Sequence, residues 1–233
     1  MSETRTTTAR RKALRMVKVR DAYRIPVADQ PLFTGEIEDD VTESFAPAVW
    51  LVGAHGGAGV STLAHMWRPF GDAGRTWPAA DTNTACVVVA RSTHAGLEAA
   101  AQTVLAAEKQ ENGGCTVLGV IVVADAPGKM PKQLGSRLPV IEALVPVWHL
   151  PYVPGIRLSE RGSLASWNPG DEIVTGRKAK KLSVHDAVPA QFAGVAEEIF
   201  TLAFDRQAPE LVAVDTDVED SPTDEQSDDT ATA

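Results

Sequence analysis

Four short apolar runs rich in Val and Ile alternate with segments of helical periodicity, and this alternation restricts the fold more than any other feature of the sequence. The runs are AVWLVG, CVVVARS, CTVLGVIVVAD and PVWHLPYV. The segments after them are STLAHMWRPF, THAGLEAAAQTVLAAEKQ with Thr93 or Ser92 as its cap, KQLGSRLPVIEALV and DAVPAQFAGVAEEIFTLAF. Buried strands that alternate with helices are typical of a parallel sheet covered on both faces. We therefore predict an α/β fold of three layers, in which a mostly parallel sheet lies between helices.

Charge and composition divide the 233 residues into three parts. Residues 1–45 change from basic to acidic without sustained apolar periodicity, so we expect mostly a mobile arm, of which part packs on the core. Residues 46–205 hold all the predicted strands and helices and form one domain. Residues 206–233 carry nine acidic residues against Arg206 alone, and this composition predicts a disordered acidic tail.

The sequence also indicates where the protein works. No apolar run approaches the roughly 20 residues needed to cross a bilayer, so we expect a cytoplasmic protein without a membrane partner. The two cysteines, Cys86 and Cys115, each open an apolar run, where a buried thiol fits. The histidines lack the spacing of metal ligands, and we therefore expect no zinc site.

A glycine-rich loop, VGAHGGAGVSTLAHMW, joins the first strand to the first helix. Such a loop can direct several backbone amides at one anion. In the usual P-loop, GxxxxGK[ST], a lysine reaches the phosphates and the next hydroxyl binds magnesium. Here Val60 occupies the lysine position and Ser61 the hydroxyl position, which makes Ser61 the candidate magnesium ligand. The candidate nucleotide-binding residues of the loop are His55, Gly56, Gly57, Ala58, Gly59, Val60, Ser61 and Thr62.

The order HGGAGVST resembles the deviant P-loop of the ParA and MinD family of ATPases. Five loop residues match that pattern, whereas His55 and Val60 stand where the family has lysines. PYVPGIRL is similar to the segment in which the family packs a proline against the base, and VIVVAD to the strand that ends in its base-reading asparagine, where this chain has Asp125. The resemblance implies a trimmed P-loop NTPase-like fold, a site for ATP or another nucleotide with magnesium, and a homodimer. The loop also resembles that of an uncharacterised group of actinobacterial P-loop-like proteins associated with mobile elements.

Departures from the family pattern argue against catalysis. Only Asp72 and Asp81 lie where the family has a magnesium-linked aspartate, and neither follows a clear apolar run, although RTWPA could form a short strand. Losing one charge-assisted hydrogen bond to phosphate costs roughly 1.5–3 kcal/mol, or about 10- to 100-fold in affinity, which binding can survive. Hydrolysis depends on positioned charge around the transferred phosphoryl group, so we expect it to be lost. Lys129 and Lys132 follow a strand end and could replace the missing cation, or they are simply solvated.

Several candidate residues have two interpretations. His55 either donates to a phosphate or is a loop histidine bonded to backbone. Asp125 either accepts from a base amino group or caps the turn DAPG. The basic run Arg177, Lys178, Lys180 and Lys181, like the basic N-terminal arm, either meets nucleic acid or is solvated surface.

Three functions remain open from the sequence. The first is a degenerate nucleotide-binding protein without significant ATPase activity, which acts through a protein partner as a regulator or adaptor in a DNA maintenance, conjugative transfer or secretion system. The second is an interaction scaffold with an empty nucleotide site. The third is an oxidoreductase, because GAHGGAGVSTL also fits the GxxGxxG loop of a Rossmann NAD(P) site. Tyr23 and Tyr152 both lack the lysine four residues on that such dehydrogenases need.

Overall fold

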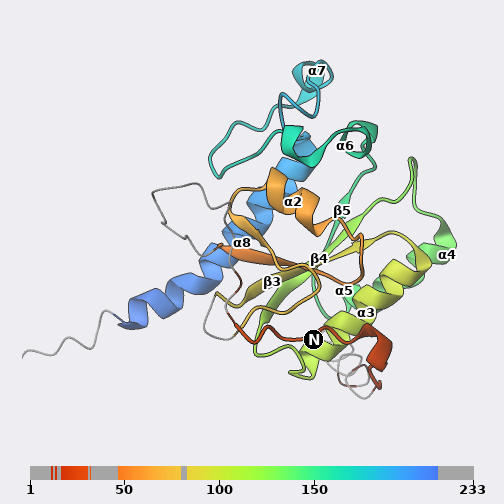
Figure 1. Ribbon diagram of the computed structural model, residues 1–233, viewed down its shortest axis with the longest axis vertical. Coiled ribbons are helices and arrows are strands. Elements are labelled where there is room, and N and C mark those ends of the chain that lie inside the picture. The colour runs from red at the N-terminus through yellow and green to blue at the C-terminus, as the bar shows by residue number, and fades with distance from the viewer. Residues whose placement is uncertain are drawn as a thin grey trace, which may run out of the picture.

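Five parallel strands form the centre of the protein (Figure 1). The computed structural model describes residues 12, 14, 17–30, 32, 47–79 and 83–214, with side chains up to Arg206. The sheet has the order β2-β1-β3-β4-β5, and every pairing in it is parallel. The strands are β1 (Val49–Gly53), β2 (Phe70–Asp72), β3 (Ala85–Arg91), β4 (Thr116–Val123) and β5 (Val147–Leu150). The predicted α/β fold with a parallel sheet is confirmed.

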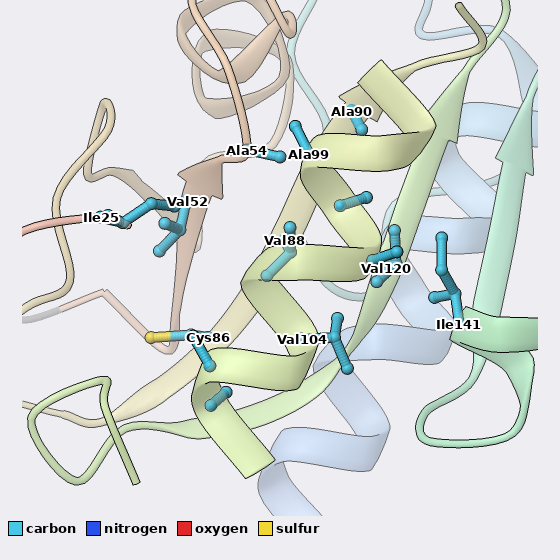
Figure 2. Packing of buried hydrophobic residues seen from close by; sticks show 14 of the residues in the cluster. Ile25, Val52, Ala54, Cys86, Val88, Ala90, Ala99, Val104, Val120 and Ile141 are labelled. Carbon is cyan, nitrogen blue, oxygen red and sulfur yellow. The ribbon is translucent and has the colours of Figure 1, made fainter. Parts of the chain in front are cut away.

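Helices cover both faces of the sheet. The helices α3 (His94–Glu108) and α5 (Leu138–Glu142) pack on one face, where Val52, Val88 and Val120 are buried (Figure 2). On the other face lie α2 (Val60–Met66) and α8 (Ala190–Val214), which pack on Leu51, Val87 and Ile121. Adjacent strand residues thus belong to opposite cores, which explains why the runs are apolar throughout rather than alternating.

Short helices fill the connections. The segment between β4 and β5 contains α4 (Lys132–Gly135) before α5, so the predicted helix KQLGSRLPVIEALV is two short helices with Pro139 in the second. Residues 151–188, which we call the β5–α8 excursion, contain α6 (Pro154–Leu158), the 3-10 helix η2 (Arg161–Ser163) and α7 (Gly176–Ala179). The excursion returns to α2, where the Trp167 amide donates to the Met66 carbonyl and the Arg68 amide to the Trp167 carbonyl.

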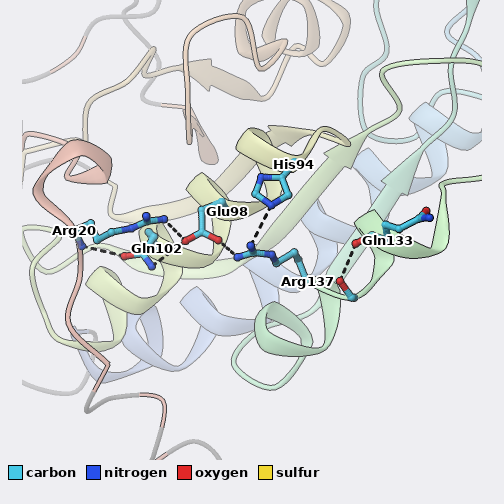
Figure 3. Close-up of polar contacts among 7 residues, drawn as sticks. Arg20, His94, Glu98, Gln102, Gln133 and Arg137 are labelled. Carbon is cyan, nitrogen blue, oxygen red and sulfur yellow. Dashed lines mark hydrogen bonds and ion pairs between the residues drawn. The ribbon is translucent and has the colours of Figure 1, made fainter.

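Residues 17–30 of the N-terminal arm pack against α3 through a 3-10 helix, η1 (Asp21–Tyr23), and the buried side chains of Val19 and Ile25. The Arg20 amide donates to the Gln102 side chain, and the Arg20 guanidinium pairs with the carboxylate of Glu98 on α3. Arg137, just before α5, pairs with the same carboxylate (Figure 3). The rest of the arm, which we expected to be mobile, lies mostly outside the described residues.

Two element boundaries differ from the sequence predictions. The helix α8 continues to Val214, past Asp205, where the acidic tail was expected to begin, although this stretch contains Pro209, a poor helix former. Residues 215–233 lie outside the described part. The helix expected over 61–70 ends at Met66, since Phe70 pairs with Val49 as the start of β2. RTWPA forms no strand of the sheet, and its Trp77 makes an isolated bridge to Val27.

Among the described residues, no helix is long and apolar enough to span a membrane.

Candidate functional site

The strand order places the glycine loop at the point where the sheet reverses its winding. β1 lies between β2 and β3, so the crossover to β2 runs toward one edge and the later crossovers run toward the other. In open parallel sheets, ligands bind outside the carboxyl ends of the strands at this reversal. The loop between β1 and α2 and the end of β3 both lie there. The topology therefore favours this edge of the sheet as the binding site.

The backbone of the glycine loop is open to a ligand. Gly57 and Gly59 have φ values of 74° and 106°, in a region that L side chains rarely adopt, which accounts for glycine at both positions. Within the described part of the chain, no backbone amide from His55 to Thr62 donates a hydrogen bond to a residue outside the loop. Gly56 and Gly57 are exposed. These amides are the donors with which glycine loops bind anions.

His55 holds the loop against β3. Its Nε2 accepts a hydrogen bond from the Arg91 amide at 3.0 Å, so the proton of the neutral ring lies on Nδ1, which donates to the Gly56 carbonyl at 2.9 Å. Of the two interpretations of His55, the hydrogen bonds match the loop histidine bonded to backbone. A neutral ring with both nitrogens engaged does not supply the charge of the family's lysine.

The side chain at the lysine position is part of the core. Val60 is 7% exposed and packs close to Gly53, where a Cβ would lie 3.2 Å from Val60 Cγ2. Ala58 is also buried. Ser61 is half-buried, and its hydroxyl makes no hydrogen bond within the described residues. These three positions contribute no charge to the mouth of the loop.

A cleft of about 470 Å³ lies beside the loop, and we call it the glycine-loop cleft. Its walls come from the loop and α2, from the ends of β3, β4 and β5, and from α6. Of the residues predicted for a nucleotide site, Gly59, Thr62 and Asp125 line this cavity. The other loop candidates, His55, Gly56, Gly57, Ala58, Val60 and Ser61, do not line it. The lining residues that matter most for chemistry are Gly59, Thr62, Arg91, Asp125, Tyr152 and Arg157.

Arg91, the last residue of β3, supplies the cation that the loop lacks. Its Nε donates to the Gly57 carbonyl at 3.3 Å and its Nη1 to the Ala124 carbonyl at 3.4 Å, so the guanidinium spans from the loop to the end of β4. Sequence reasoning did not identify Arg91 as a site residue. The signal was present, because Arg91 is the single charged residue in CVVVARS and ends the strand next to β1.

The segment PYVPGIRL also lines the cleft. Pro151 and Tyr152 follow β5, and Ile156 and Arg157 lie in α6. Asp125 follows β4 and is exposed; its amide donates to the Ser92 hydroxyl at 2.9 Å, and its carboxylate makes no hydrogen bond within the described residues. An aromatic side chain, a proline and a free carboxylate are suited to a planar base with an amino group.

The other predicted cations lie elsewhere. Lys129 lines a second cleft of about 700 Å³, which shares Ala124, Asp125 and Pro151 with the glycine-loop cleft. Lys132 begins α4, is exposed, and lines neither cleft. The basic run lies on and just after α7, at the outer end of the excursion (Figure 1), and all of its members are exposed: Arg177, Lys178, Lys180 and Lys181.

The acids expected near the loop do not enter the glycine-loop cleft. Asp72 ends β2, next to β1, and its Oδ1 accepts from the Gly74 amide at 2.8 Å. Asp81 lies outside the described residues. No group of three or more potential metal-ligating side chains occurs among the residues described. Of those lining the cleft, only Asp125 carries a carboxylate.

Comparison with known proteins places this site inside a region that other proteins share. Residues 47–157, a little under half of the chain, match the model of a family of unknown function (DUF6668). The match begins before β1 and ends at Arg157, so it includes the glycine loop, Arg91 and Asp125. No curated protein matches the chain. No solved structure matches it either.

Proposed function

We propose that this protein binds a nucleotide in the glycine-loop cleft without hydrolysing it at a significant rate, as a degenerate P-loop protein. The observation that supports the proposal is the shared cleft, because Gly59 and Thr62 of the loop region, Asp125 and the PYVPGIRL segment line one cavity. Its volume of about 470 Å³ lies within the range of small-molecule sites, roughly 300–1,000 Å³.

Each end of the cleft suits one part of a nucleotide. At one end, the loop amides that donate no hydrogen bond to the rest of the chain can bind phosphate oxygens, as can the Thr62 hydroxyl. At the other end, Pro151 and Tyr152 offer apolar surface for a base, and Asp125 offers an acceptor for its amino group. The ligand would therefore lie along the carboxyl ends of β3, β4 and β5, with its phosphates at the loop.

The two positions that hold lysines in the ParA and MinD pattern carry His55 and Val60 in this chain, which argues against hydrolysis. Val60 is packed into the core in place of the lysine, and both nitrogens of His55 are hydrogen-bonded to backbone. Phosphoryl transfer requires charge placed around the transferred group, which these side chains do not supply. A bound nucleotide would then act as a structural or regulatory ligand.

Calorimetry with ATP, ADP and GTP, each with and without magnesium, tests the proposal. We expect binding of at least one nucleotide and phosphate release no faster than in buffer. Gly59→Ala should lower the affinity at least about tenfold, because a Cβ is strained at a φ of 106° and distorts the loop. Gly162→Ala is the matched control, since Gly162 does not line the cleft, has no positive φ, and a Cβ there meets nothing within 4 Å.

Two results would overturn the proposal. If no nucleotide binds, the interaction scaffold with an empty site is the better interpretation. If nucleotide is hydrolysed at an ordinary ATPase rate, the loss of catalysis is wrong.

A dinucleotide site is the second candidate, and one observation favours it. Asp72 stands at the end of β2 beside β1, the position from which an acid binds the ribose in Rossmann NAD sites. The glycine-loop cleft opens toward β3, β4 and β5 instead. Calorimetry with NAD and NADP, and with Asp72→Asn, separates the two: a dinucleotide protein binds NAD or NADP and loses affinity in the variant, whereas the nucleotide site proposed above is unaffected.

The biological role is a separate part of the proposal. A regulator or adaptor in a DNA maintenance, conjugative transfer or secretion system is what the resemblance of the loop to ParA and MinD implies. A protein partner and a homodimer belong to the same implication. The exposed basic run at α7 is the surface that nucleic acid would contact, and its substitution by glutamine should then weaken DNA binding.

A further inference from the structure

We infer that Arg91 and Arg157 neutralise the phosphates of the bound nucleotide in place of both the loop lysine and magnesium, so that the ligand is a metal-free nucleoside diphosphate. This inference rests on the proposed function and deepens it. It concerns which side chains supply positive charge to the site, because the glycine loop itself offers only neutral backbone amides.

Arg91 is a cation without an acidic partner inside a concave site. Its two hydrogen bonds are to backbone carbonyls and are long, 3.3 and 3.4 Å, and Nη2 makes none among the described residues. Arg20, Arg24 and Arg137 differ, since each forms an ion pair with a carboxylate. A half-buried guanidinium that is held in place but not neutralised is suited to bind an anion.

Arg157 provides a second charge on the facing element. It lies in α6, lines the same cleft as Arg91, and forms no hydrogen bond or ion pair within the described part of the chain. Its side chain is exposed and is therefore able to turn toward a ligand. Arginine binds phosphate through two parallel N–H groups, so two arginines can each contact one phosphate group of a diphosphate.

The phosphate end of the cleft offers magnesium one hydroxyl, that of Thr62, and no carboxylate from the described lining residues. Magnesium sites in nucleotide-binding proteins combine one or two carboxylates or hydroxyls with the ligand's phosphates and waters. Asp125 is the single carboxylate among the described lining residues, and it belongs to the base end in the proposed orientation. Ser61, the candidate magnesium ligand, does not line the cleft, and Asp72 is turned to the Gly74 amide. The positive charge at the phosphate end therefore comes from arginine.

This arrangement makes magnesium a competitor. Magnesium-bound ADP already carries the cation that the two arginines would supply, and its phosphate oxygens are partly occupied. We expect ADP to bind more tightly in EDTA than in excess magnesium. Removing one arginine should cost at least about tenfold in affinity, the effect of one lost charge-assisted contact to phosphate.

The experiment is calorimetric titration of the full-length protein with ADP and with adenosine, in EDTA and in excess magnesium. The variants are Arg91→Gln and Arg157→Gln. Arg161→Gln is the control, because Arg161 is an exposed arginine of the same excursion that does not line the cleft. Adenosine distinguishes the loss of a phosphate contact from a distorted cleft. A variant that only distorts the cleft lowers the affinity for adenosine and for ADP alike, whereas loss of a phosphate contact lowers the affinity for ADP alone.

The expected result is tight ADP binding in EDTA, a loss of about tenfold or more in both arginine variants, and no change in the control or with adenosine. ADP binding that requires magnesium, or that both variants retain in full, overturns the inference and leaves the nucleotide site standing. Absence of ADP binding to the wild-type protein, with ATP and GTP also unbound, overturns the inference and the proposed function together.

Discussion

Gly96 is the residue on which the geometry of the site depends most closely. It lies in the first turn of α3, where a Cβ would sit 2.3 Å from the Arg91 carbonyl oxygen and 3.0 Å from His55 Nε2. Only glycine lets α3 approach the end of β3 and the ring of His55 this closely. One position thus fixes the spacing between helix, strand and loop.

Gly96→Ala should therefore lower the free energy of unfolding by roughly 1–3 kcal/mol, the cost of overpacking a closed contact. Denaturant unfolding measures the loss. The control is Gly194→Ala in α8, where a Cβ meets nothing within 4 Å. This variant should gain about 0.5–1 kcal/mol, because alanine is the better helix former. Equal stabilities of the two variants would contradict the close contact at Gly96.

Val60→Lys tests the buried character of the lysine position. The side chain of Val60 packs in the core beside Gly53, so a lysine there must bury its charge or leave the contact. We expect a loss of roughly 1–3 kcal/mol in the free energy of unfolding, measured in denaturant. Val60→Ile, which keeps the apolar contact, should stay within about 1.5 kcal/mol of the wild type. A lysine variant as stable as the wild type would mean that this position opens to the loop.

The two cysteines make a prediction about reactivity. Burial raises the pKa of Cys86, whereas a hydrogen bond from Cys86 lowers the pKa of Cys115. The thiolate is the reactive form, so at a mildly alkaline pH Cys115 should react with a thiol reagent before Cys86. Both thiols are free and buried, and unfolding should speed both reactions. Mass spectrometry of peptides from the labelled wild-type protein gives the two rates separately, and faster labelling of Cys86 would contradict the assignment.

At the scale of single residues, sequence reasoning identified the loop and Asp125 but not the arginines. Gly59, Thr62 and Asp125 could be found because glycine spacing and the end of an apolar strand are local patterns. Arg91 and Arg157 enter the cleft through tertiary packing: β3 brings one beside the loop, and α6 brings the other across it. The sequence placed Arg91 at the end of a strand and Arg157 inside PYVPGIRL, but neither pattern shows that the two side chains line one cleft.

Among the elements, α3 is the helix against which residues 17–30 of the N-terminal arm pack. Its Thr93 cap, foreseen from the sequence, accepts from the Gly96 amide at 3.0 Å. Glu98, 8% exposed, is shared between Arg20 of the arm and Arg137 beside α5 (Figure 3). The Glu98 carboxylate thus joins the arm to the core beside the buried side chains of Val19 and Ile25.

Glu98→Gln should release the arm. The neutral amide leaves two arginines without a counter-charge, and we expect faster trypsin cleavage after Arg20 and Arg24. Limited proteolysis with mass spectrometry locates the cuts. Glu197→Gln, at an exposed position of α8, should leave the digestion pattern unchanged. If the arm is cut no faster in the Glu98 variant, the ion pairs are not what holds it.

The elements that the sequence did not predict are the shortest ones. The three residues of β2 carry no periodicity of their own, and they become a strand because β1 offers them backbone partners. The helices α6 and α7 are similarly brief and depend on the fold around them. The long helices and the Val-rich strands were visible because each buries a face that repeats along the sequence.

For the whole molecule, the two cores share one sheet and should unfold together. Trp50 and Trp77 belong to the core under α3, whereas Trp67, Trp148 and Trp167 belong to the core under α2 and α8. Tryptophan fluorescence of two variants reports each core separately: one has Trp50 and Trp77 replaced by phenylalanine, and the other has Trp67, Trp148 and Trp167 replaced. Each variant should show the same unfolding midpoint by fluorescence as by circular dichroism. Separate midpoints would mean that the layers are independent.

The outermost strands of the sheet are also its two shortest, β2 with 3 residues and β5 with 4, against 8 in β4. Each edge of the sheet therefore exposes only a few unpaired backbone groups. These are too few for a strand of another chain to pair with and extend the sheet. Self-association of this protein would then have to use helical or loop surfaces, and fibrillar aggregation by strand addition is disfavoured from either side.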